Sequence, residues 1–172
     1  MDAGLILLRF VHIMCGVFWA GTLLFFATLV EPSIRESGPD GARVMQALLR
    51  RHYLTIMPVV AGLTILSGVD LLRRVSGGFA PAWFTSPTGL TLTVGSLAAF
   101  VAFLIGVFVM RPAALRVGRL AQAAAQSPEG PGREAQLAEV QAIRRRALWG
   151  GRWVACLLTL AVAGMAVARY VR

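Results

Sequence analysis

LILLRFVHIMCGVFWAGTLLFFATLV, residues 5–30, is a continuous apolar stretch that contains one arginine and one histidine, Arg9 and His12. A helix of these 26 residues, rising ~1.5 Å per residue, is long enough to cross the ~30 Å hydrocarbon core of a bilayer. Arg9 and His12 would then lie inside the membrane, where ionisable side chains are costly and mark functional sites by default. The stretch predicts a membrane-spanning helix with a candidate site on it.

Three further apolar stretches follow the first, and 57% of the 172 residues are hydrophobic whereas only 15% are charged. Each stretch approaches the ~20 residues that a spanning helix needs. The sequence therefore predicts an all-α integral membrane protein, a four-helix bundle that forms a single transmembrane domain over residues 1–172. The expected helices cover about residues 4–30, 53–72, 89–111 and 148–169.

The basic residues are all arginines, and their distribution predicts the orientation of the bundle. The connections at residues 31–52 and 111–152 carry twelve of the 17, whereas the opposite side carries only Arg73, Arg74, Arg169 and Arg172. Because basic connections stay in the cytoplasm, we expect both termini on the non-cytoplasmic side of a bacterial inner membrane, which the chain crosses several times. This distribution also accounts for the net charge of +9, so we expect no nucleic-acid partner.

The connections differ in composition. Residues 112–147 are rich in alanine, leucine, glutamine and arginine around a break at residues 127–132, which predicts a cytoplasmic helical hairpin. Residues 31–52 predict turns at Glu31-Pro32 and at residues 38–41, followed by a short amphipathic helix over residues 42–49. On the other side, Trp83 and Phe84 resemble an interfacial aromatic anchor, and they could also contact a partner.

One face of the first helix carries Arg9, His12, Gly16, Trp19 and Leu23, because residues three or four apart stack on one side. We expect Gly16 to leave a slot that a flat ligand could use. Imidazole is an axial ligand of haem iron, and an arginine one turn away could meet a propionate. The stripe is therefore a candidate binding site for haem b; the alternative is that His12 bonds a threonine or serine of a neighbouring helix and fixes the packing.

Depth in the bilayer predicts which residues could meet His12, which should lie ~12 Å below the outer surface. Asp70 is expected nearer that surface, where a pair with Arg9 would explain how both charges are tolerated. The residues expected at the depth of His12 are Thr64, Ser67, Thr93, Ser96, Gly164 and Met165. Of these, Met165 is the candidate for a second iron ligand if His12 binds haem.

Other candidate metal ligands are weaker. His52 should lie at the opposite, cytoplasmic end, as a solvated interfacial histidine or in a separate site with Met57. Cys15 and Cys156 lie in apolar helices, and we expect small packing residues rather than a disulfide. His12 and Cys15 with a methionine could bind Cu(I), although the sequence contains no Met-x-x-Met or Cys-x-x-Cys pattern.

The segment LRFVHIMCGVFWAG, residues 8–21, has the pattern H-x6-W-x-G and resembles the opening helix of small four-helix bacterial membrane proteins of the CopD-like and HemJ-like group. The basic helical hairpin is similar as well. The resemblance to HemJ-like protoporphyrinogen oxidases implies haem b held by His12; those proteins also use a lysine, and this chain has none. The resemblance to CopD-like proteins implies copper import.

These observations lead to three functional hypotheses. The first is a haem b protein in electron transfer or porphyrin-related redox chemistry, with His12 as axial ligand and Arg9, Gly16 and Trp19 around the cofactor. The second is a non-catalytic accessory or assembly subunit, and the third is a copper transport protein. Besides the lipid bilayer, the expected partners are a larger membrane redox complex or further copies of the chain.

Overall fold

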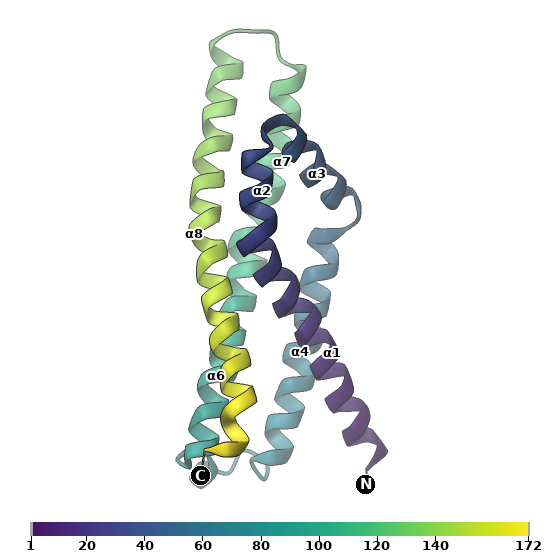
Figure 1. The fold of residues 1–172 in the computed structure, drawn as a ribbon, viewed down its shortest axis with the longest axis vertical. Helices are drawn as coiled ribbons and strands as arrows, with labels where there is room; N and C mark the ends of the chain where they lie inside the picture. The colour runs from purple at the N-terminus through teal and green to yellow at the C-terminus, as the bar shows by residue number, and fades with distance from the viewer. Residues whose placement is uncertain (1, 172) are drawn as a thin grey trace.

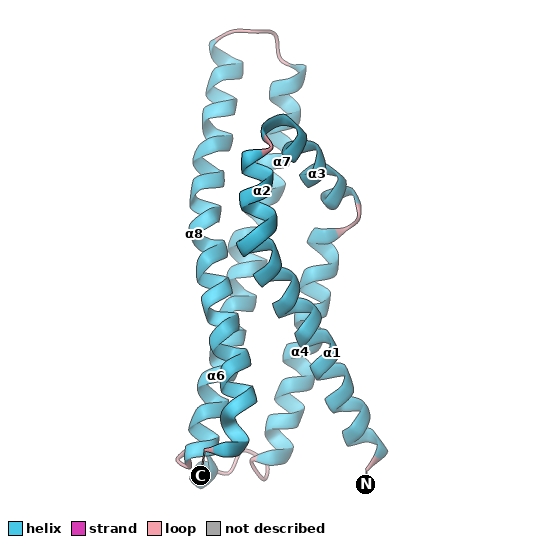
Figure 2. Ribbon diagram, viewed as in Figure 1, coloured by secondary structure: helices cyan, strands magenta, loops and turns pink. Residues whose placement is uncertain are grey.

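The computed structural model describes residues 2–171, and within them it is a bundle of helices with short connections and no strand (Figures 1 and 2). This confirms the predicted all-α four-helix bundle. In chain order the elements are α1 (Ala3–Phe25), the π-helical turn η1 (Phe26–Val30), α2 (Glu31–Glu36), α3 (Gly38–Arg50), α4 (Tyr53–Val75), α5 (Pro81–Phe84), α6 (Pro87–Ile105), the π-helical turn η2 (Gly106–Met110), α7 (Arg111–Gln126), α8 (Pro131–Val167) and the 3₁₀ turn η3 (Ala168–Tyr170).

Four continuous helical segments are long and apolar enough to cross a membrane: Ala3–Glu36, Tyr53–Val75, Pro87–Gln126 and Pro131–Tyr170. All four extend beyond the predicted bounds, the second by only three residues at its C-terminal end. The long extensions of the third and fourth are the helices of the predicted hairpin. The hairpin of α7 and α8 is confirmed, and the break between its helices is shorter than predicted. The turn predicted at Glu31-Pro32 is wrong, since these residues begin α2 directly after η1.

The helices form two pairs, in which α1 packs along α4 and α6 packs along α8. Both termini lie at one end of the bundle, which we call the terminal end (Figure 1). The opposite end, the hairpin end, holds α2, α3 and the α7–α8 hairpin. Within the described residues, Arg73, Arg74 and Arg169 belong to the terminal end, as predicted, whereas Arg172 lies outside the described residues.

A seam of mostly small side chains joins the two pairs near the middle of the bundle. Alanines dominate it, and the one large aromatic residue is Trp19, which is 4% exposed. Small residues allow membrane helices to approach closely, so the seam replaces the bulky core of a soluble bundle. Its buried members are Trp19, Ala20, Ala61, Ala98, Ala99, Ala102, Val154, Leu158 and Ala161.

Helices α6 and α8 approach each other closely where Gly95 and Gly164 face one another. A Cβ atom built on Gly164 would lie 3.2 Å from the carbonyl oxygen of Thr91 and 3.4 Å from the Cα atom of Gly95. A Cβ atom on Gly95 would in turn lie 3.3 Å from the carbonyl oxygen of Ala161. Gly95 therefore lets α6 approach the backbone of α8, whereas a Cβ atom on Gly106 would meet no atom within 4 Å.

Gly164→Val should push α6 and α8 apart and lower the free energy of unfolding by about 1–3 kcal/mol, the usual cost of overpacking. Thermal unfolding of the detergent-purified protein measures the loss. Gly62→Val is the matched control, because a Cβ atom at Gly62 meets no atom within 4 Å. Equal melting temperatures for the two variants would contradict the close packing.

Proline shapes the spanning helices at three places. Each of the two π-helical turns lies just before a proline: the N–H of Glu31 donates to the carbonyl of Phe26 ahead of Pro32, and the N–H of Arg111 donates to the carbonyl of Gly106 ahead of Pro112. Local π adjustments re-pair backbone groups where proline removes an N–H. The helices therefore continue past both prolines instead of ending.

Pro58, inside α4, leaves the carbonyl of Leu54 without its helical N–H donor four residues on. The side chain of Arg111 takes that place: its Nε atom donates to the Leu54 oxygen at 3.1 Å. Arg111 begins α7, so this bond ties the two helix pairs together at the hairpin side of the seam.

Arg111→Leu should lower the free energy of unfolding by about 1.5–3 kcal/mol, the range for hydrogen bonds to charged groups. In a Pro58→Ala background the N–H of residue 58 can bond the Leu54 carbonyl, so the same substitution should cost at least ~1 kcal/mol less. A double-mutant cycle by thermal or chemical unfolding measures the difference. An unchanged cost would show that Arg111 stabilises the bundle in another way.

Candidate functional site

His12 lies between α1 and α4, half-buried, with its imidazole against the backbone of α4. Its Nδ1 atom is 2.9 Å from the carbonyl oxygen of Thr64 and 3.3 Å from Oγ of Ser67. The prediction that Thr64 and Ser67 share the depth of His12 is confirmed. The serine contact named in the packing alternative is also present, with the backbone of Thr64 as the closer partner.

The two contacts determine the tautomer of the neutral imidazole. A carbonyl oxygen can only accept, so Nδ1 must carry the proton and donate it to Thr64. The hydroxyl of Ser67 donates to the Leu63 carbonyl at 2.6 Å, which leaves its lone pairs for Nδ1. Nε2 is consequently the nitrogen with a free lone pair, able to accept a hydrogen bond or ligate a metal.

Gly68 makes room for the ring. A Cβ atom built on this glycine would lie 2.8 Å from Cε1 and 3.3 Å from Nδ1 of His12, so any larger residue would displace the imidazole. Gly68 was not among the residues predicted for the site, although it is four residues after Thr64 and thus on the same face of α4.

The space beside Gly16 is occupied. A Cβ atom on Gly16 would lie 3.5 Å from Cγ2 of Thr64, an ordinary van der Waals contact. The slot that we predicted there is therefore filled by the methyl group of Thr64. Trp19, one turn further along α1, is buried in the alanine seam.

Arg9 is exposed, and among the described residues it makes no ion pair or side-chain hydrogen bond. The predicted pair with Asp70 is wrong. Asp70 instead binds Arg73 Nη2 at 2.8 Å and Arg74 Nε at 3.0 Å, both on its own helix. Residues three and four apart on a helix meet without any tertiary adjustment, so these partners outcompete Arg9.

The same cluster reaches the start of α1. Arg74 Nη1 lies 3.4 Å from Oδ2 of Asp2, while Oδ1 of Asp2 accepts from the N–H of Gly4 at 2.9 Å and caps the helix. The ends of α1 and α4 are thus joined by charge at the terminal end, and by His12 further in.

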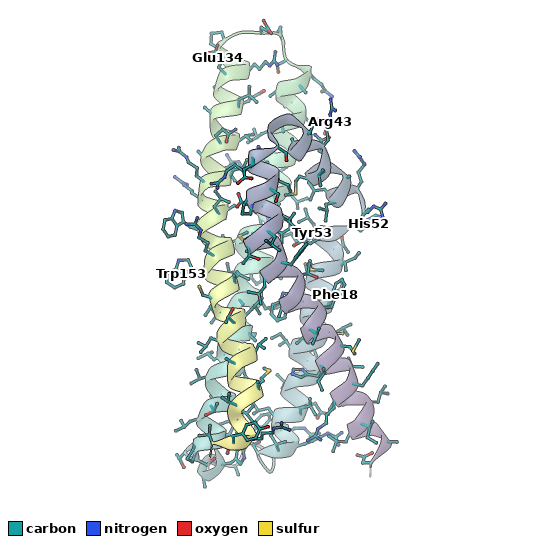
Figure 3. The ribbon with its side chains drawn as sticks, viewed as in Figure 1. Phe18, Arg43, His52, Tyr53, Glu134 and Trp153 are labelled. Carbon is teal, nitrogen blue, oxygen red and sulfur yellow. The ribbon has the colours of Figure 1, made fainter. Side chains whose placement is uncertain are left out.

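The other candidate ligands lie apart from one another. Met165 is on α8 and 36% exposed, and its neighbour Gly164 faces α6. His52 is exposed in the turn before α4, as predicted for a solvated histidine, and Figure 3 shows it pointing away from the bundle. Met57 is buried.

Both cysteines are free thiols; Cys15 is half-buried, and Cys156 is exposed on the outer face of α8 rather than packed. Among residues 2–171, no three His, Cys, Asp or Glu side chains gather where they could hold a metal ion. Nε2 of His12 is the ring nitrogen that the described contacts leave free.

The predicted aromatic anchor is a small cluster in the connection between α4 and α6. Trp83 and Phe84 are half-buried, with their rings edge to face at 5.2 Å between centroids, and Phe84 stacks on Phe79 at 6.5 Å. Much of their surface is used within the cluster. A second aromatic pair, Trp149 and Trp153, lies on the outer face of α8, more than 60% exposed in each case.

Gly68→Ala should displace the imidazole of His12 and weaken the contact of α1 with α4, at a cost of about 1–3 kcal/mol in unfolding free energy. Gly62→Ala is the control on the same helix, where a Cβ atom meets nothing. ¹⁵N NMR of histidine-labelled protein should show the neutral Nδ1–H tautomer for His12 in the wild type and in the control. A neutral Nε2–H tautomer in the wild type would contradict the bond to Thr64.

Comparison with models of protein families, with curated proteins and with solved structures found no match to this chain.

Proposed function

We propose that this chain is a small membrane haem b protein in which His12 is an axial ligand of the iron. One observation carries the proposal: Nδ1 of His12 donates to the Thr64 carbonyl at 2.9 Å, which leaves the lone pair on Nε2. Histidines that ligate metals almost always donate their other ring N–H to a carbonyl or carboxylate, which fixes the tautomer and raises the basicity of the ligand.

Some of the residues around His12 also fit a haem site. Gly68 and Ser67 hold the ring in one orientation against α4, as a ligand must be held. Arg9 lies one turn nearer the terminal end and has no carboxylate partner among the described residues, so it is available to a propionate. Met165 is the proposed second ligand. Haem b, when bound, supplies a one-electron couple for electron transfer or porphyrin-related redox chemistry.

The proposal includes location and partners. Twelve of the 17 arginines belong to the hairpin end, which supports a cytoplasmic position for that end and a non-cytoplasmic position for both termini. The resemblance of residues 8–21 to the CopD-like and HemJ-like group favours a bacterial inner membrane. An electron partner would be a larger membrane redox complex or another copy of the chain.

The visible absorption spectrum of the detergent-purified protein, oxidised and dithionite-reduced, tests the proposal. Protein expressed with ample haem should show a Soret band and reduced α and β bands, which His12→Ala should remove or strongly weaken. His52→Ala is the matched control, because the other histidine is exposed at the hairpin end. A featureless wild-type spectrum, or bands unaffected by His12→Ala, would refute haem ligation by His12.

A non-catalytic accessory subunit is the second candidate, and a specific observation favours it. The bonds of His12 and the contact of Gly16 with Thr64 already explain both residues as packing groups between α1 and α4. A featureless spectrum combined with a lower melting temperature for His12→Ala would support this function. Interhelical hydrogen bonds in membranes contribute about 0.6–2 kcal/mol, so the expected loss is of that order.

A further inference from the structure

A groove at the hairpin end lies between α1 with η1, the amphipathic helix α3, and the start of α4. The groove is open on one side and has a volume of about 320 Å³, within the ~300–1,000 Å³ typical of sites for small molecules. Its walls are almost wholly apolar, and Phe26 and Tyr53 stack at 5.9 Å between ring centroids to form one side. Figure 3 labels Phe18 on α1 and Tyr53 on α4, two of its lining residues.

Arg51 is the one charged residue among those that line the groove. It is exposed, and within residues 2–171 no carboxylate forms an ion pair with it. Its position is set by the sharp turn between α3 and α4, where His52 adopts the left-handed conformation with φ of 59°. Arg50 and His52, on either side of it in sequence, are exposed and do not line the groove.

An apolar groove whose one charged lining residue, Arg51, has no carboxylate partner among residues 2–171 matches an amphipathic anion. The groove lies where a spanning helix meets an amphipathic one, so hydrocarbon chains and headgroups are both within reach. A guanidinium binds phosphate oxygens through two parallel N–H donors, and basic pockets between spanning helices are sites for anionic headgroups. We propose that the groove holds an acyl chain of an anionic phospholipid whose phosphate binds Arg51. This site is independent of haem and of His12.

Native mass spectrometry of the full chain in detergent, titrated with dioleoyl phosphatidylglycerol or dioleoyl phosphatidylcholine, tests the charge. The two lipids share their acyl chains and differ in net charge. The wild type should bind phosphatidylglycerol more tightly, and Arg51→Gln should reduce that affinity about tenfold, the effect of losing one charge-assisted contact. Arg50→Gln removes one positive charge at the adjacent residue and should leave the preference for phosphatidylglycerol unchanged.

A second pair of variants tests the groove itself. Ile56 lines it, so Ile56→Trp should fill it and weaken binding of both lipids, whereas Leu66→Trp, on the exposed face of the same helix, should not. Thermal unfolding checks that all four variants remain folded. Equal losses for Arg50→Gln and Arg51→Gln, or binding unaffected by Ile56→Trp, would overturn the proposal in favour of a diffuse basic surface.

Discussion

Inside hydrocarbon no water is available to a backbone carbonyl or N–H, so each must find its partner within the protein. The prolines of this chain show how strongly that constraint acts. Before Pro32 and Pro112 the backbone widens into a π turn, and opposite Pro58 an arginine from another helix supplies the missing donor. The bond from Arg111 to Leu54 thereby turns a local backbone defect in α4 into a tertiary contact between the two helix pairs.

The same constraint gives the His12 site its form. A polar ring in an apolar helix needs an acceptor, and the face of α4 offers a carbonyl, a hydroxyl and a glycine at one level. These contacts hold α1 against α4 and, at the same time, direct the free lone pair of the ring to Nε2. A packing role and a ligand role for His12 therefore require the same contacts from Thr64, Ser67 and Gly68. A cofactor-specific signal such as an absorption band is needed to distinguish the two roles.

The spanning helices and the hairpin were predictable from the sequence because length and composition determine them. Counting residues from the helix ends correctly predicted that Thr64 and Ser67 lie at the level of His12. The prediction for Asp70 was wrong because Arg73 and Arg74, on its own helix, are nearer than Arg9. The turn predicted at Glu31-Pro32 was wrong because the π-helical turn η1, which lets the helix continue past Pro32, has no sequence signature. From the sequence, Arg111 and Arg51 had a role only in the charge distribution. Their contacts depend on how α3, α4 and α7 pack together, and no local sequence pattern predicts that packing.

The alanine seam has a consequence of its own. Alanine has no side-chain rotamers, so burying a row of alanines freezes almost no conformational entropy. A row of alanines also lacks the large side chains that, like interdigitated leucines, would fix the register of one helix against another. The two helix pairs thus meet at the middle mainly through small side chains, with Trp19 as the one large aromatic group, and Arg111 adds a hydrogen bond at the hairpin side. Such a contact resists separation of the pairs more than it resists sliding or tilting of one pair against the other.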